Sequence, residues 1–112
     1  MPDCLFCKIV AREIPAQLVL EDAHAIVIKD ISPKAPTHVL VVPKKHIDRL
    51  SSTDDGDAEL LGRLQRTAVA AAAKLSLKDF RLVTNNGRGA GQSVDHLHYH
   101  LLGGRPMEWP PG

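Results

Sequence analysis

Cysteine is nearly absent from this chain. Its two cysteines, Cys4 and Cys7, stand too close together to form a framework of disulfides. Long apolar runs are also missing, since no stretch approaches the roughly 20 residues of a membrane-spanning helix. Neither sign of charge dominates, because 14 Lys and Arg face 13 Asp and Glu. This balance argues against a broad nucleic-acid-binding surface and leaves room only for a small anion pocket.

The N-terminal region lacks the apolar stretch of a secretion signal. Charged residues begin at Asp3 and recur at Lys8 and Arg12. We therefore expect a cytoplasmic protein with neither membrane nor nucleic acid as a partner. The 112 residues suit one domain with a modest core, and we expect 1–112 to form it.

The pattern of apolar residues predicts an α+β fold, with a largely antiparallel sheet of about five strands and two helices. A short helix is expected over 4–11, capped by Asp3 and ended before Pro15. A long helix should follow the capping residues of 53–57 and reach about Leu75. The tail 105–112 holds three prolines and should be irregular. Strands are expected at 17–21, 25–29, 38–42, 80–84 and 97–102.

Three histidines, His96, His98 and His100, alternate along one short apolar segment. Side chains of a strand point to opposite faces with a period of two, so these three are expected to share one face. Alternate histidines on a strand can bind one zinc ion. Neutral imidazoles can equally serve as nucleophiles toward phosphorus near pH 7. The spacing alone leaves both alternatives open.

A glycine-rich loop precedes the histidines. Gly87, Gly89 and Gly91 permit backbone conformations that gather N–H groups around an anion, although a plain flexible turn fits the same spacing. The loop runs through Gln92 and Ser93 into the histidine segment. An oxyanion pocket beside imidazoles favours phosphorus chemistry.

The middle histidine is the candidate nucleophile. His98 has an imidazole on either side, and an acceptor must hold the N–H that it does not use for attack. Ser93 lies near enough in sequence to deliver a proton to a leaving group, and His100 could donate to a phosphate oxygen.

The chain resembles the histidine triad family of nucleotide-binding proteins, specifically its Hint branch. The family signature is present as His96-Leu97-His98-Tyr99-His100-Leu101-Leu102, and the similarity covers nearly the whole chain. Further matching segments are Phe6-Cys7-Lys8-Ile9, Glu13-Ile14-Pro15, Asp30-Ile31-Ser32-Pro33, Ala35-Pro36-Thr37-His38, Val42-Pro43-Lys44-Lys45-His46, Gly91-Gln92-Ser93-Val94, Gly103-Gly104-Arg105 and Trp109-Pro110-Pro111-Gly112.

The resemblance implies a purine nucleoside phosphoramidate hydrolase, which releases AMP from an amine or from an aminoacyl adenylate. It implies that His98 attacks the α-phosphorus and forms a nucleotidyl-histidine while Ser93 assists departure of the amine. His96, His100 and a fourth histidine, His38, would complete the catalytic group. It also implies a homodimer whose two sheets join into one of ten strands, with Trp109 near the partner's active site.

The resemblance assigns nucleotide binding to residues spread along the chain. Asp30 would bind the ribose hydroxyls, and Asn85 would contact the phosphate or the leaving-group side. Without the resemblance, both would be ordinary turn residues, and the apolar members of the set would be core. The other members are Leu5, Phe6, Ile9, Ile28, Ile31, Gly91, Gln92, Ser93, His98 and His100.

Some family members, mostly bacterial, bind a structural zinc through a C-x-x-C pair such as Cys4 and Cys7. The resemblance implies His46 and His96 as the remaining ligands. Two thiolates and two imidazoles make a closed tetrahedral site, which is structural rather than catalytic. The alternative is a pair of half-buried cysteines on the first helix. No cofactor is expected for the reaction itself.

Other functions fit the same sequence. A nucleotide-binding regulator needs the same pocket, and a zinc hydrolase would use all three alternating histidines without a covalent intermediate. A dinucleoside polyphosphate hydrolase of the same family is a further alternative, against which the tail around Trp109 counts. Asp95 departs from the family pattern beside His96, and we expect little effect because it alternates to the opposite face.

Overall fold

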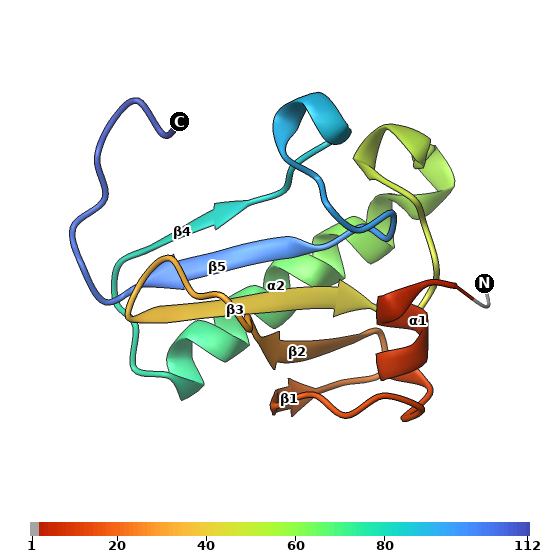
Figure 1. The fold of residues 1–112 in the computed structure, drawn as a ribbon, viewed down its shortest axis with the longest axis horizontal. Coiled ribbons are helices and arrows are strands. Elements are labelled where there is room, and N and C mark those ends of the chain that lie inside the picture. Colours follow the sequence, from red (N-terminus) through yellow and green to blue (C-terminus); the bar gives the residue numbers. More distant parts are fainter. Residues whose placement is uncertain (1–2) are drawn as a thin grey trace.

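A five-stranded sheet forms the centre of the computed structural model, which describes residues 3–112 (Figure 1). The strand order is β1-β2-β3-β5-β4, and every neighbouring pair is antiparallel. The predicted α+β fold, with an antiparallel sheet of five strands and two helices, is confirmed. The strands are β1 (Leu18–Glu21), β2 (Ala25–Lys29), β3 (Thr37–Pro43), β4 (Phe80–Val83) and β5 (Tyr99–Gly103).

Two α-helices pack against this sheet in different places. The long helix α2 (Ala58–Lys74) lies across one face, and the short helix α1 (Leu5–Val10) lies at the end of the sheet where β3 finishes (Figure 1). Within residues 3–112, no helix is long and apolar enough to cross a membrane. Three short 3-10 helices complete the elements: η1 (Leu50–Ser52), η2 (Asp55–Asp57) and η3 (Arg88–Ala90).

Alternation along the strands gives the sheet two buried faces. Val39 and Val41 of β3 join the α2 layer, whereas Leu40 and Val42 join the layer under α1. His100 of β5 pairs with Leu40, and His38 stands two residues before Leu40. Because the side-chain period is two, both histidines lie on the α1 face. The α2 layer also holds Val27, Leu64, Ala68, Ala71 and Leu101, and the α1 layer holds Phe6, Ile9, Ile26 and Ile28.

The first helix begins one residue later than predicted. Its N-cap is Cys4 rather than Asp3, because the Cys4 Sγ accepts a hydrogen bond of 3.4 Å from the Cys7 backbone N–H. The helix ends at Val10, well before Pro15, since Arg12 adopts a left-handed φ of 65°.

The histidine segment differs more from the prediction. Strand β5 starts at Tyr99, so His96 and His98 precede it and only His100 lies within it. Other partners hold the preceding backbone. The Leu97 N–H donates to the Ile47 carbonyl at 2.6 Å, and the Thr84 hydroxyl donates to the His98 carbonyl at 2.8 Å. The three histidines therefore do not form one straight row on a strand.

The capping residues before the long helix also act differently from the prediction. Asp54 caps η2 through a capping box with Asp57, and α2 starts only at Ala58. Residues 105–112 form neither helix nor strand. The tail lies beside β4, since the Arg81 guanidinium donates to the Glu108 carbonyl at 2.8 Å and lies 6.0 Å from the Trp109 ring centroid.

Candidate functional site

A cleft of about 720 Å³ opens on the α1 face of the sheet. Its lining combines apolar side chains with polar ones, among them Asp30, Ser93, His98 and His100. A mixed lining of this kind suits a ligand that has both a flat ring and a charged group. The apolar lining includes Leu5, Phe6, Ile9, Ile28 and Ile31, all of them predicted nucleotide-binding residues.

The tautomer of His98 is fixed by its own backbone. Its Nδ1 lies 2.8 Å from the His96 carbonyl oxygen. A carbonyl can only accept, so Nδ1 carries the proton and donates it. The Nε2 of His98 therefore keeps its lone pair, in a side chain that lines the cleft.

A chain of hydrogen bonds fixes the next two rings. The Lys34 backbone N–H donates to His38 Nδ1 at 3.0 Å, so the proton of a neutral His38 is on Nε2. That Nε2–H lies 2.9 Å from His100 Nδ1 and 3.4 Å from Asp30 Oδ2. Because His100 Nδ1 accepts this hydrogen bond, the proton of a neutral His100 is on Nε2, which is left as a donor. The site then presents an acceptor on His98 beside a donor on His100.

Burial keeps these rings neutral. Desolvation lowers the pKa of His98, and it lowers the pKa of His100 to about 4, with the neighbouring His98 and His38 adding to the effect. Burial also lowers the pKa of His38, and the Asp30 carboxylate opposes this shift. A neutral imidazole at pH 7 is what a nitrogen nucleophile requires.

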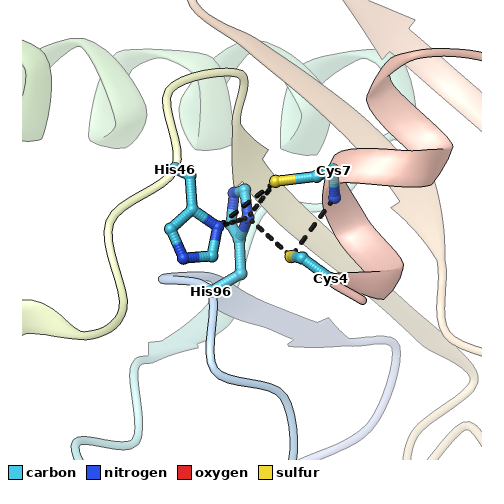
Figure 2. Close-up of side chains that lie close together, drawn as sticks. All are labelled: Cys4, Cys7, His46 and His96. Carbon is cyan, nitrogen blue, oxygen red and sulfur yellow. Dashed lines mark hydrogen bonds between the residues drawn. The ribbon is translucent and has the colours of Figure 1, made fainter. Parts of the chain in front are cut away.

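A second group of side chains lies next to the cleft. Four side chains converge on one point: Cys4 at the N-cap of α1, Cys7 within α1, His46 from the loop after β3, and His96 (Figure 2). Their four ligand atoms lie within 4.8 Å of one another. The Cys4 Sγ is 3.3 Å from His96 Nδ1, and the Cys7 Sγ is 3.2 Å from His46 Nδ1.

These four residues can hold a metal ion. Each histidine uses its other nitrogen as a donor: His46 Nε2–H to Asp48 Oδ1 at 2.8 Å, and His96 Nε2–H to the Pro43 carbonyl at 2.8 Å. Partners of this kind orient metal-ligating histidines in proteins. Sulfur and nitrogen ligands of a tetrahedral zinc ion stand about 3.3–3.8 Å apart, close to the separations found here.

These four residues, the metal group, share α1 with the cleft. Phe6 is 4% exposed, and its ring packs edge-on against His96 at 5.8 Å and His98 at 5.0 Å between centroids. The cysteines thus anchor the same helix whose apolar residues form the cleft wall. His96 is fully buried. Its Nδ1 faces the Cys4 sulfur, and its Nε2–H donates to the Pro43 carbonyl.

Asp30, His38 and His100 form another cluster whose ligand atoms lie within 4.8 Å. The hydrogen bond from the Lys34 N–H argues against a metal there. It occupies the Nδ1 lone pair of His38, so Nε2 carries the proton and has no lone pair to offer. The triad rings also separate: His96 joins the cysteines, while His98 and His100 face the cleft.

The glycine loop lies beside the polar end of the cleft. Gly87 and Gly91 adopt φ values of 93° and 95°, which favour glycine. A Cβ on Gly91 would lie 3.7 Å from Asn85 Nδ2, so Asn85 and Gly91 are neighbours. Ser93 lines the cleft, whereas Asn85, Gly91 and Gln92 are outside its lining. The Gln92 side chain is 3% exposed and turned inward.

Sequence reasoning missed the groups that orient the histidines. Asp48 holds His46, and its position two residues further along the chain was the only available signal. The Lys34 N–H and the Pro43 carbonyl are backbone groups, which carry no sequence signal. Thr84, the residue after β4, gave no reason to expect a bond to the His98 carbonyl.

Known proteins resemble this chain over most of its length. A family model described as HIT domain matches residues 11–107. An uncharacterised HIT-like protein of Synechocystis sp. is 52% identical over 111 residues, which are 98% of this chain and 97% of that protein.

Solved structures of similar proteins share the fold. A HIT family hydrolase of Legionella pneumophila is 49% identical with a TM-score of 0.95, over 98% of this chain and 100% of that one. A histidine triad nucleotide-binding protein of Candida albicans is 33% identical with a TM-score of 0.82, over 96% of this chain and 83% of that one. With its triad and the match over most of its length, the chain belongs to the HIT domain family.

Proposed function

We propose that this protein hydrolyses purine nucleoside phosphoramidates, as expected of the Hint branch, with His98 as a covalent nucleophile. Aminoacyl adenylates belong to the same substrate class, because they also release AMP. The similar Legionella and Candida proteins, one named a hydrolase and the other nucleotide-binding, support a hydrolase acting on a nucleotide.

The observation that carries the proposal is the fixed tautomer of His98. Its Nδ1–H is committed to the His96 carbonyl at 2.8 Å, and its side chain lines the cleft. The lone pair on Nε2 is therefore available to a ligand. Burial lowers the pKa of His98, so the ring stays neutral and nucleophilic near pH 7.

The reaction takes two displacements at phosphorus. In the first, Nε2 of His98 forms a bond to the α-phosphorus and the P–N bond to the amine breaks. The Ser93 hydroxyl gives its proton to the departing nitrogen. In the second, water attacks phosphorus, the bond to Nε2 breaks, and a water proton restores Ser93. The sum is phosphoramidate plus water to AMP plus amine. Two in-line steps retain the configuration at phosphorus.

The other cleft residues bind the substrate. The apolar wall of Leu5, Phe6, Ile9, Ile28 and Ile31 would take the purine, and the Asp30 carboxylate would accept from the ribose hydroxyls. His100 Nε2–H would donate to a non-bridging oxygen. Asn85 and the backbone of Gly91, Gln92 and Ser93 would lie on the phosphate side, and His38 would keep His100 in its donating tautomer.

We propose that the metal group is a zinc site. Cys4, Cys7, His46 and His96 would hold it, and it would supply a rigid tetrahedral anchor rather than a reactive centre. The Nδ1 atoms of His46 and His96 both face the centre of the group with a lone pair, which suits a cation. In this proposal His96 supports the site through the metal and through its carbonyl bond to His98.

The whole chain would act as one HIT domain, 1–112, with 105–112 as an extended tail. We further propose that two copies pair through the outer edge of β4, which is an edge strand, to give a ten-stranded sheet. Phe80 of β4 is 39% exposed, and Trp109 of the adjacent tail is 82% exposed. Pairing at this edge would bring the tail towards the partner's cleft. Light scattering of wild type and Phe80→Asp tests this, and a monomeric wild type would refute it.

Hydrolysis itself is tested with an adenosine phosphoramidate of a fluorescent amine. Wild type should release AMP in the presence and absence of a mild chelator, and His98→Ala should lose at least about 1,000-fold in kcat. Mass spectrometry after rapid quenching should find a nucleotidyl group on the peptide that contains His98. The matched control is His24→Ala, at an exposed histidine in the turn before β2. Unchanged activity in His98→Ala would refute the mechanism.

A further inference from the structure

Gln92 stands immediately before Ser93, yet its side chain does not reach the cleft. It is 3% exposed, and its amide makes three hydrogen bonds inside the protein. The Gly87 N–H donates to Oε1 at 2.8 Å, while Nε2 donates to the Asp48 carbonyl at 2.8 Å and to the Val94 carbonyl at 2.9 Å. One acceptor site and both amide hydrogens of the side chain are used.

Two of these bonds hold the chain on either side of Ser93. The bond to Val94 spans Ser93 from the residue before it to the residue after it, and the bond to Gly87 closes the glycine loop. The Gln92 backbone N–H adds a bond of 3.1 Å to the Gly87 carbonyl. A loop with two glycines at positive φ has many conformations when free. The buried amide selects one of them.

The third bond ties the loop to the metal group. Asp48 offers its carbonyl to Gln92 and its carboxylate to His46. The segment that carries a metal ligand and the segment that carries Ser93 are therefore joined at one residue. Nearby, the Ser51 N–H donates to Asn86 Oδ1 at 2.8 Å and strengthens the same junction.

Arg88 holds the loop from the outside. Its Nη1 donates to the Ser93 carbonyl at 2.8 Å and to the Gln92 carbonyl at 3.2 Å, and its Nη2 donates to Asp95 Oδ2 at 2.8 Å. Arg49 lies 3.7 Å from the other oxygen of Asp95. Asp95, the residue that departs from the family pattern, thus orients the Arg88 guanidinium that holds the Ser93 carbonyl.

We propose that Gln92 is a positioning residue for Ser93, with Arg88 as its outer counterpart, and that the pair fixes the Ser93 hydroxyl where it protonates the departing amine. This inference rests on the proposed phosphoramidate hydrolysis and adds a role that depends on the leaving group. Misplacing a catalytic group by about 1 Å can cost roughly 100-fold in rate. The loss should appear only where the leaving group needs a proton.

The test compares two substrates in the full chain, purified without chelator. One is an adenosine phosphoramidate of an alkylamine, which needs a proton to leave. The other is the nitrophenyl ester of AMP, whose leaving group departs as an anion. Gln92→Met should lower kcat for the alkylamine substrate by roughly 10–100-fold with KM little changed, and should alter the ester turnover less than about threefold. In a Ser93→Ala background, Gln92→Met should lower kcat little further, because both substitutions remove the same contribution, proton donation by Ser93.

The controls separate positioning from stability. Gln65→Met, at an exposed position of α2, should leave both activities unchanged. Amide hydrogen exchange over 87–94 should be faster in Gln92→Met than in wild type, which does not depend on turnover. If Gln92→Met does not fold, Arg88→Met takes its place, since the Arg88 side chain is 62% exposed, with Arg63→Met as its control.

Three outcomes overturn the inference. They are equal losses for both substrates, a full additional loss in the Ser93→Ala background, and unchanged activity with faster hydrogen exchange. Each would make Gln92 a purely structural residue. The proposed function fails separately, and the inference with it, if wild type releases no AMP from either substrate and no nucleotidyl-His98 forms.

Discussion

The Nδ1 atoms of His46 and His96 face each other at 3.1 Å, and neither has a proton to give. His46 spends its N–H on Asp48 and His96 spends its N–H on the Pro43 carbonyl. Two lone pairs at this distance repel each other unless a cation or the thiol protons of Cys4 and Cys7 lie against them, and a single cation would serve both nitrogens and both sulfurs. With the sulfurs of Cys4 and Cys7 beside them, this arrangement supports our assignment of zinc.

Removing the proposed zinc should destabilise the protein. We expect one zinc per chain in wild type and less than a tenth of that in Cys4→Ser, with Tm lowered by roughly 10 °C, which is a few kcal/mol in a chain of this size. Metal analysis and thermal unfolding with and without a strong chelator measure both effects. His24→Gln removes an exposed histidine outside the group and should keep the zinc. Full stability in a zinc-free wild type would contradict the assignment.

Loss of the metal should also weaken nucleotide binding. The cysteines anchor α1, and Leu5, Phe6 and Ile9 of that helix line the cleft. We expect the Kd of AMP, measured by calorimetry, to rise at least about tenfold in Cys7→Ser, which is about 1.4 kcal/mol. Gly103→Ala serves as a control that lowers stability from the far end of β5. Equal weakening in both variants would trace the effect to stability alone.

Stability should fall in mild acid because of His100. Burial lowers its pKa to about 4, with the neighbouring His98 and His38 adding to the shift and the Asp30 carboxylate opposing it, against about 6.5 in an unfolded chain. As pH drops from 6.5 towards 4, the unfolded state binds the proton first, so the free energy of unfolding decreases through this window. His100→Asn cannot titrate, and its Oδ1 can still accept from His38. Between pH 7 and pH 5, wild type should lose about 2 kcal/mol more than the variant in urea unfolding. Parallel curves for the two proteins would contradict this prediction.

Two glycines should respond to alanine in opposite directions. A Cβ on Gly103 would lie 2.8 Å from Leu77 Cδ2 and 3.2 Å from the Asp79 carbonyl oxygen, so Gly103→Ala should cost about 1–3 kcal/mol. Gly62 is exposed within α2, and a Cβ there would meet nothing within 4 Å. Gly62→Ala should therefore raise stability by up to about 1 kcal/mol, because alanine favours the helix. Urea unfolding of both variants provides the measurement, and a shift of the same sign in both would refute the argument.

The fold was predictable because local pattern and burial agree over most of the chain. A strand was predicted at 38–42 and a long helix ending near Leu75, and the structure has β3 and α2 at these places. The end of α1 was predicted to within one residue, but its physical cause, the left-handed conformation of Arg12, leaves no signal in the sequence. The start of β5 depends on Ile47 and Thr84, which take the backbone bonds of Leu97 and His98.

The sequence by itself determined which chemical groups the protein has: the triad, the C-x-x-C pair, the glycine loop and the strands that bury an apolar core. Only the tertiary structure decided what each histidine does. His96 and His98 would share a face on a regular strand, but outside the strand one faces the cysteines and the other faces the cleft. Their tautomers follow from the Pro43 and His96 carbonyls, and that of His38 follows from the Lys34 N–H. Every residue except proline carries both backbone groups, so residue identity cannot say which of them a folded chain brings to a particular ring.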